Sequence, residues 1–90
     1  MSKFFFKLYV SGNTLRSRRA IANLQTFCDC QLQDRSEIEI IDVTEFPEIA
    51  ESQKILITPT LIRELPLPKE RIIGDLSDTK VLSLALDLLQ

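Results

Sequence analysis

A nearly continuous run of aromatic and aliphatic side chains from Phe4 to Val10 constrains the fold of this chain more than any other segment. A strand with one wet face alternates apolar and polar residues, whereas a strand covered on both faces reads as an unbroken apolar run. We therefore predict a central strand at residues 4–10. Lys7 interrupts the run, so it is either a strand-edge lysine whose ammonium group reaches water or a member of a buried ion pair.

The segments after this strand predict the first half of an α/β fold. Ser11 to Thr14 has turn and capping chemistry, and apolar residues then recur at helical spacing, which predicts a helix from about Thr14 to Leu32. Residues 37–43 alternate before becoming apolar, as in a second strand. A strand, a helix and a strand in succession favour a right-handed crossover between parallel strands.

The second half of the chain contains all four prolines. Pro47 suits the first position of a short helix. Pro59 breaks an apolar run over residues 55–62, and because proline cannot donate to a sheet, it must lie at the start or the edge of a strand. Pro66 and Pro68 predict a stiff, extended connector after this strand.

The last residues predict a short strand and a final helix. A strand at residues 71–73 is followed by a turn at Gly74 and Asp75, and Ser77 is the predicted cap of the helix. The apolar face of that helix consists of Val81, Leu82, Leu84, Ala85, Leu88 and Leu89. The predicted order of elements is therefore βαβαββα, in a single domain that spans residues 1–90.

The charge of the chain disfavours nucleic acid as a partner. Eleven basic and thirteen acidic residues leave a net charge of −2, which lacks the positive excess that binding to a phosphate backbone requires. The charges are unevenly placed, with five bases and no acid in residues 1–28 and eight carboxylates in residues 29–52. They either form a positive and a negative face, suited to docking or to head-to-tail stacking, or intermix in the folded molecule.

The N-terminus does not mark the chain for export or for a membrane. Lys7 interrupts the apolar run well before a signal-peptide core or a membrane span would be complete. Two cysteines without a disulfide pattern suit a reducing compartment. We therefore expect a cytoplasmic protein that contacts no membrane.

The residue types that carry most enzyme chemistry are missing or misplaced. The chain has no histidine, the side chain most often used for proton transfer near neutral pH. Cys28 and Cys30 are spaced neither as a C-x-x-C redox pair nor as a zinc site, so we expect free thiols. Gly12 and Gly74 stand too far apart for a phosphate-binding loop. We therefore expect a binding protein, not an enzyme, without a metal or another cofactor.

The order of elements, together with the segment Ile57-Thr58-Pro59-Thr60-Leu61, resembles the thioredoxin fold. In that fold the proline before the third strand is usually cis, so we expect a cis Pro59, the alternative being an ordinary trans proline at a strand edge. Thioredoxin-like oxidoreductases carry their thiols between the first strand and the first helix, where this chain has Gly12-Asn13-Thr14-Leu15-Arg16. Without sulfur there, disulfide exchange by the usual mechanism is excluded.

Four blocks of sequence closely resemble KaiB, a family of cyanobacterial circadian clock proteins. The blocks are Lys7-Leu8-Tyr9-Val10-x-Gly12-Asn13-Thr14, Ile41-Asp42-Val43, Lys54-Ile55-Leu56-x-Thr58-Pro59-Thr60-Leu61 and Arg71-Ile72-Ile73-Gly74-Asp75-Leu76-Ser77. This resemblance implies a non-catalytic adaptor that binds the hexameric ATPase KaiC, captures KaiA once docked and alters which output histidine kinase is engaged.

The KaiB resemblance also implies two folds for one chain. In the family, the C-terminal half rearranges between a ground state, usually a tetramer, and a thioredoxin-like monomer that binds partners. Ala85 stands where many relatives have glycine, and alanine favours a helix by about 0.8 to 1 kcal/mol, so we expect the thioredoxin-like state to be favoured. Asp87 should change its environment between the folds. Pro66 and Pro68 stand where the family often has three prolines, with no predicted direction of effect.

The resemblance further assigns candidate partner contacts. Glu51 and Lys54 match the KaiC-facing part of the family, although a surface ion pair between them explains both nearly as well. Arg19 and Arg71 match basic family positions, the alternative being solvated arginines on a helix and on an edge strand. Glu39 stands where basic residues are common and would invert the charge of a KaiA-facing surface.

Lys7, in the first predicted strand, is the remaining candidate partner contact.

Three other functions fit parts of the pattern. The charge at Glu39 suits a divergent KaiB paralogue in signalling that is not circadian. A sensor domain like the N-terminal domain of the kinase SasA would share the fold and the binding surface. A thioredoxin-like redox protein using Cys28 or Cys30 is disfavoured, because both lie deep in the first helix and not at its activated start.

Overall fold

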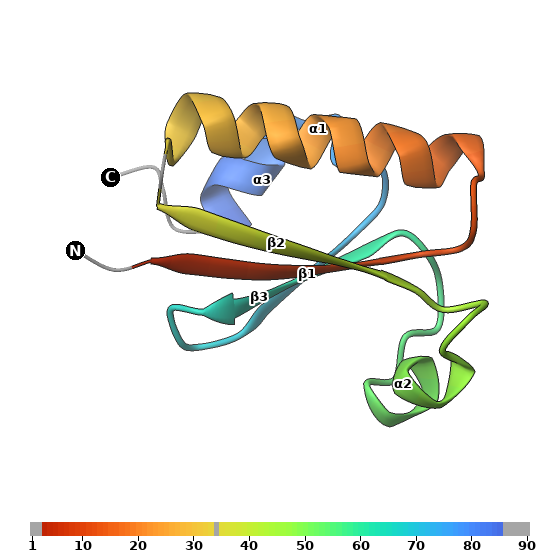
Figure 1. Cartoon of the computed structure of the whole chain (residues 1–90). Coiled ribbons are helices and arrows are strands. Elements are labelled where there is room, and N and C mark those ends of the chain that lie inside the picture. The colour runs from red at the N-terminus through yellow and green to blue at the C-terminus, as the bar shows by residue number, and fades with distance from the viewer. Residues whose placement is uncertain (1–2, 34, 86–90) are drawn as a thin grey trace.

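The chain folds into a four-stranded mixed sheet with helices on both faces (Figure 1). The computed structural model describes residues 3–33 and 35–85. The elements are β1 (Phe4–Val10), α1 (Leu15–Gln31), β2 (Ser36–Asp42), α2 (Pro47–Ser52), β3 (Thr60–Leu65), β4 (Glu70–Ile73) and α3 (Thr79–Ala85). The strand order is β2-β1-β3-β4, with β1 and β2 parallel and the other two pairs antiparallel. The predicted βαβαββα order is confirmed.

The prediction of a central strand at residues 4–10 is confirmed, because β1 lies between β2 and β3. The main core lies on the side of α1 and α3 and contains Phe4, Phe6, Leu8, Val10, Ala20, Leu24, Phe27, Cys28, Leu32, Leu61, Leu76 and Leu82. On the other face, Tyr9, Ile41 and Ile62 form a smaller cluster near α2. Figure 1 shows α2 at one end of this second face, so the sheet is covered more completely on the side of α1 and α3.

Helix α1 begins and ends close to its predicted limits. Thr14 is the N-cap, and its side-chain oxygen accepts a hydrogen bond from the Ser17 N–H (3.2 Å). The helix buries one stripe of side chains, including Leu24 and Cys28, against the sheet. At the other end, the Leu32 N–H donates to the Cys28 carbonyl (2.9 Å).

Two prolines lie where the sequence predicts. Pro47 is the first residue of α2, and Pro59 immediately precedes β3. The Thr58–Pro59 peptide bond is cis, which confirms the expectation drawn from the thioredoxin fold. The apolar run at residues 55–62 is therefore not one strand, because only its part after Pro59 pairs with β1 and β4.

The segment between β3 and β4 corrects one prediction. The sequence predicts an extended connector, but β3 and β4 are antiparallel neighbours, so the chain must reverse direction, and residues 66–68 form bends. Pro66 and Pro68 both follow cis peptide bonds. The Arg63 guanidinium donates from Nη2 to the Pro68 carbonyl (2.6 Å), which fastens the turn to β3.

The start of the last helix corrects a second prediction. Asp78 and not Ser77 caps α3, because the Asp78 Oδ1 accepts hydrogen bonds from the N–H groups of Lys80 (3.0 Å) and Val81 (3.2 Å). Ser77 instead donates its backbone N–H to Asp75 Oδ1 (3.1 Å). A carboxylate at the N-cap also interacts favourably with the positive end of the helix.

The apolar face of α3 is narrower than predicted within the described residues. Leu82 is 1% exposed and belongs to the main core, whereas Val81 and Leu84 are at least half exposed. The helix extends as predicted through Ala85. Asp87 and the leucines after it lie outside the described residues, so the expected change in the environment of Asp87 stays a prediction.

Candidate protein-docking surface

One row of side chains crosses all four strands on the face near α2. Lys7 lies opposite Glu39 of β2 and Ile62 of β3, and Ile62 lies opposite Arg71 of β4. Side chains opposite each other on neighbouring strands point to the same face of a sheet. Ile62 belongs to the cluster near α2, so the whole row lies on that side. The sheet therefore brings together three candidate contacts from distant parts of the sequence.

Lys7 lies on the central strand, so the expectation of a strand-edge lysine is wrong. Its side chain is half-buried, and its Nζ lies 5.9 Å from the centre of the Phe5 ring. At that distance the face of an aromatic ring attracts a cation. Among the residues that the structure describes, no ion pair includes Lys7, although the exposed Glu39 lies beside it. The aromatic ring takes the place of the carboxylate partner considered from the sequence.

Arg71 connects β4 to the end of α2. Its Nη1 donates to the Lys54 carbonyl (2.9 Å), and its Nη2 donates to the Gln53 carbonyl (2.8 Å). Both carbonyls follow the last turn of α2, where a helix leaves backbone acceptors without partners of its own. The guanidinium therefore links β4 to the segment after α2. The sequence had suggested either a partner contact or a solvated arginine on an edge strand, and neither interpretation included this link.

Glu51 and Lys54 lie together at the end of α2. The ion pair between them that the sequence suggested is not among the ion pairs of the described residues. The helix ends at Ser52, and Lys54 has a left-handed backbone with φ of 56°, so the helical i,i+3 spacing is not kept. The Lys54 N–H instead donates to the Glu51 carbonyl (3.2 Å). Both side chains are exposed.

Three large apolar side chains flank α2 and face solvent. Leu56 is 95% exposed, and Phe46 and Ile57 are nearly half exposed. Exposed apolar side chains that gather in one region are typical of protein-docking surfaces. We call residues 46–58, which comprise α2 and these flanking segments, the α2 tip.

The sequence pattern did not reveal these apolar contacts. Leu56 and Ile57 stand in an apolar run that looks like a strand, and the loop in which they lie is seen only in the structure. A signal was present in Pro59, because a proline that starts a strand leaves the apolar residues before it outside the sheet.

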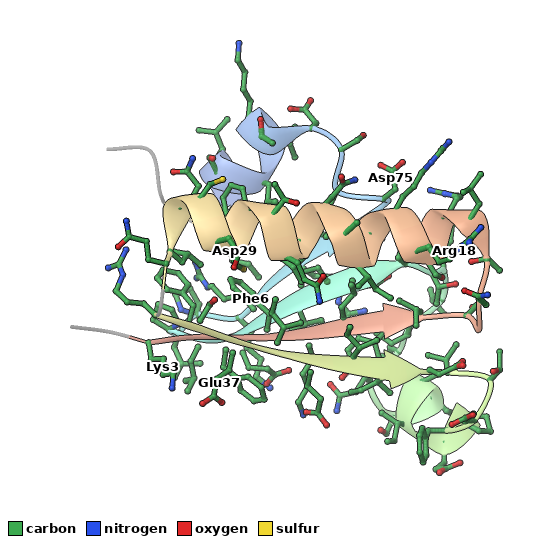
Figure 2. All side chains as sticks on the ribbon, turned by 45° about the horizontal axis from the view of Figure 1, so that its top comes forward. Lys3, Phe6, Arg18, Asp29, Glu37 and Asp75 are labelled. Carbon is green, nitrogen blue, oxygen red and sulfur yellow. The ribbon has the colours of Figure 1, made fainter. Side chains whose placement is uncertain are left out.

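The charges separate on one side of the sheet and mix on the other. The exposed bases of α1 are Arg16, Arg18 and Arg19, and the exposed carboxylates of the α2 tip are Glu48 and Glu51, with Glu45 immediately before it. Figure 2 shows Arg18 near one end of α1 and Asp29 toward the other. Near α2, however, Lys54 and Arg71 lie among the carboxylates. The expectation of two faces of opposite charge is met only in part.

Arg19 lies apart from the α2 tip, on the exposed face of α1 across the sheet. With Arg16 it influences Asp75, in the turn between β4 and α3. Hydrogen bonds from Ser77 hold the pKa of the Asp75 carboxyl below its usual value, and the two arginines lower it further. The Asp75 carbonyl accepts a hydrogen bond from Asn23 Nδ2 (2.7 Å), which ties this turn to α1.

Gly74 meets Pro59 across the sheet. The Gly74 N–H donates to the Pro59 carbonyl (3.0 Å), immediately beyond the paired residues of β3 and β4. Gly74 has a φ of 124°, a conformation that glycine adopts readily and other residues rarely do. The glycine therefore allows β4 to turn toward α3 while staying attached to the start of β3.

Hydroxyl groups surround the position at which thioredoxins carry thiols. Ser11 Oγ lies 2.5 Å from the Oγ1 atom of Thr58, the residue that precedes Pro59. The buried Ser17 Oγ accepts hydrogen bonds from the Ser11 N–H (3.1 Å) and from Thr14 Oγ1 (2.8 Å). These groups bond to one another and offer no thiolate for disulfide exchange.

The two cysteines lie toward the other end of α1. Burial raises the pKa of the Cys28 thiol, which disfavours the reactive thiolate. Cys30 is exposed but stands about 20 Å along the helix from its first turn. Within the described ranges, no group of three or more histidine, cysteine, aspartate or glutamate residues is placed to hold a metal. None of the helices described is long and apolar enough to cross a membrane.

Comparison with known families agrees with this arrangement. The model of the KaiB domain matches residues 7–88. The chain belongs to the KaiB family. It is 49% identical over 88 residues to the circadian clock protein KaiB3 of Synechocystis sp., covering 98% of this chain and 86% of that protein. It is 48% identical over 86 residues to the circadian clock oscillator protein KaiB of Synechococcus elongatus, covering 96% of this chain and 84% of that protein.

Solved structures show that this KaiB-family chain has the thioredoxin-like fold. The N-terminal domain of SasA from Synechococcus elongatus superposes with a TM-score of 0.79 at 18% identity, over 100% of this chain and 89% of that domain. Mitochondrial thioredoxin 3 of Saccharomyces cerevisiae superposes with a TM-score of 0.74 at 16% identity, over 97% of this chain and 80% of the thioredoxin. The expectations of a KaiB-family member and of a thioredoxin-like fold are confirmed.

Proposed function

We propose that this protein is a non-catalytic circadian clock adaptor of the KaiB type, which docks on a KaiC-like hexameric ATPase through the α2 tip. Membership of the KaiB family supports the class of function. The exposure of Leu56, which is 95% open to solvent between two better-packed elements, carries the choice of surface. Covering such a side chain with a partner recovers the free energy that its exposure to water costs.

Docking is proposed to use the thioredoxin-like monomer. The proposed alternative is a ground state, a tetramer in which the C-terminal half has rearranged. Only the binding-competent state contributes to affinity, so a large population of the thioredoxin-like monomer removes the loss that a rare state would impose. Ala85, which favours helix at the end of α3, supports such a population.

The candidate contacts are proposed to serve two partners. Glu51 and Lys54 lie on the α2 tip and would contact KaiC together with Leu56. Lys7 and Glu39 lie beside each other on the same face of the sheet and would meet a second partner, KaiA or an output histidine kinase.

A divergent paralogue in signalling that is not circadian is the second candidate function, and Glu39 favours it. This exposed carboxylate on β2 gives negative charge to a place where KaiA-binding relatives often carry a base. Like charges across an interface suppress binding. KaiA capture is therefore proposed to be weaker for this chain than for relatives with a base there, whereas docking on KaiC through the α2 tip is common to both candidates.

Binding to purified KaiC hexamers from Synechocystis and from Synechococcus elongatus tests the proposal. We expect native mass spectrometry to show a complex at about 20 μM of each protein. Leu56→Ala should weaken the complex about tenfold, because an anchor side chain is lost. The matched control is Leu67→Ala, which removes a leucine that is 70% exposed in the β3–β4 turn, outside the α2 tip, and should change affinity less than about twofold.

Two results would contradict this proposal. Absence of any complex with either hexamer would remove the adaptor function. Equal losses for the two leucine variants would leave the adaptor function standing but move the docking surface away from the α2 tip.

A further inference from the structure

The contact between Arg71 and the end of α2 has the chemistry of a helix cap. Two nitrogens of one guanidinium reach two successive backbone carbonyls, at 2.8 Å for Gln53 and 2.9 Å for Lys54. The carboxyl end of a helix carries partial negative charge and unpaired acceptors, both of which a cation satisfies. The cation comes from β4, a strand that is remote in sequence, so the contact holds two elements together.

The backbone at Lys54 needs such support. Its φ of 56° is a left-handed conformation, which a residue with a side chain adopts only when its surroundings hold it there. The Lys54 N–H donates to the Glu51 carbonyl (3.2 Å), and the next N–H, of Ile55, donates to the Ala50 carbonyl (2.8 Å). Arg71 donates a hydrogen bond to the Lys54 carbonyl and so adds to the hydrogen bonds that fix the path of the chain as it leaves α2.

The residues that follow are held at their other end as well. Thr60 Oγ1 donates to the Ile57 carbonyl (2.6 Å), and the hydroxyl groups of Thr58 and Ser11 lie 2.5 Å apart. Leu56 stands between these two anchored ends, with its side chain in solvent. A loop fixed at both ends loses less conformational freedom on binding than one that is free at one end.

We infer that Arg71 is a positioning residue for docking: its guanidinium fixes the carboxyl end of α2 and thereby presents Leu56 and Ile57 to the partner. This inference rests on the proposed function, in which the α2 tip docks on a KaiC-type partner. It gives the basic side chain at position 71 a role that acts through the loop and not by contact with the partner. Arginine suits this role better than lysine, because its planar fork can bond two carbonyls at once.

Hydrogen exchange in the free full-length chain tests the positioning step without any partner. We expect Arg71→Gln to speed exchange about tenfold at the hydrogen-bonded amides within residues 53–57, which are those of Gln53, Lys54 and Ile55, and to leave the amides of α1 unchanged. Arg71→Lys should resemble Arg71→Gln, because one ammonium group cannot replace the fork. The matched control is Arg18→Gln, which removes the same charge from an exposed site on α1 and should not alter residues 53–57.

Binding to a KaiC hexamer tests the consequence for docking. Arg71→Gln should weaken binding about fivefold, and Leu56→Ala, which costs about tenfold in the natural chain, should cost less than about threefold in the Arg71→Gln background, because residues that act through one contact are not additive. Normal affinity of Arg71→Gln with a loosened loop would overturn the inference. So would reduced affinity with exchange at residues 53–57 unchanged, since Arg71 would then touch the partner directly.

The two tests also separate this inference from the proposed function. If the natural chain binds neither KaiC hexamer, the proposed function fails and the docking role of Arg71 fails with it. The exchange comparison then still decides whether Arg71 orders residues 53–57, and unchanged exchange would refute that step by itself.

Discussion

The two halves of this chain differ in how they are held. Residues 4–32 supply nine of the twelve buried members of the main core that the structure describes, and residues 61–82 supply three. Those three are Leu61 in β3, Leu76 in the turn after β4 and Leu82 in α3. The N-terminal half is therefore a scaffold that would keep most of its buried contacts if the C-terminal half moved.

The C-terminal half, from α2 onward, is attached to the scaffold by the pairing of β3 with β1 and by polar contacts. Asn23 Nδ2 in α1 donates to the Asp75 carbonyl, and Ser11 Oγ after β1 lies within hydrogen-bond distance of Thr58 Oγ1. Polar contacts of this kind can be exchanged for others with little net change in free energy. The proposed fold switch requires such a difference, because one half must keep its packing while the other rearranges.

Paired leucine truncations test this difference most strongly. Leu24→Ala in α1 should lower the free energy of unfolding by about 3 kcal/mol and speed hydrogen exchange throughout the sheet, because it opens a cavity in the scaffold. Leu82→Ala in α3 should cost about 2 kcal/mol, with faster exchange confined to residues after Pro59. Urea unfolding and hydrogen exchange measure both effects, and equal acceleration across both halves by Leu82→Ala would contradict the division.

A smaller substitution tests the bias between the two proposed folds. Ala85→Gly should disfavour α3 by about 0.8 to 1 kcal/mol and shift the population toward the ground state by a factor of about four to five. Size-exclusion chromatography with light scattering would report the gain in tetramer. Ala22→Gly is the control, since it places the same change on an exposed position of α1 and should lower stability without changing the oligomeric state.

The smallest expected effect is the dependence of the scaffold's stability on pH. Hydrogen bonds from the Thr44 hydroxyl, the Gly12 N–H and the Thr44 N–H hold the pKa of the Asp42 carboxyl below its usual value. A carboxyl group with a lowered folded-state pKa stabilises the fold above its unfolded pKa of about 3.9, and this stabilisation is lost as the pH falls through the folded pKa. Asp42→Asn should therefore be less stable than the natural chain near neutral pH, with the difference shrinking below about pH 4.

Urea unfolding of the two proteins between about pH 3 and pH 7 measures this difference. A gap that widens as the solution becomes more acidic would have the wrong sign and would contradict the role of Asp42. The comparison also sharpens the contrast between the halves, because Asp42 fastens the β1–α1 turn to β2 within the scaffold.

Much of the fold could be predicted because its signals are local. The apolar run at residues 4–10 needs cover on both faces wherever it lies, Thr14 has a side chain that caps a helix, and the ring of Pro59 excludes a strand interior. Each of these constraints is set by the residue and its immediate neighbours, so tertiary structure did not override it.

The errors fall where a choice depends on residues elsewhere. Ser77 and Asp78 are both good caps, and the structure uses Asp78 while the Ser77 N–H bonds to Asp75. Pro66 and Pro68 form a hairpin turn because β3 and β4 pair, which their own sequence does not show. Local reasoning had no means of making either choice.

The candidate site was predictable only in part for the same reason. The blocks that resemble KaiB led to Lys54 and Arg71 as separate candidates, but their contact depends on the register of β4. Lys7 and Glu39 became neighbours only once β1 and β2 were paired. The exposure of Leu56 depends on where β3 begins, which places this leucine in a loop and not in a strand.

Hydrogen exchange of the natural chain, free and bound to a KaiC hexamer, is the most direct test of docking through the α2 tip. We expect binding to slow exchange at residues 46–58 and to leave the exposed face of α1 around Arg19 unaffected. Protection confined to α1, or a complex in which residues 46–58 exchange as fast as in the free chain, would contradict the proposed docking surface.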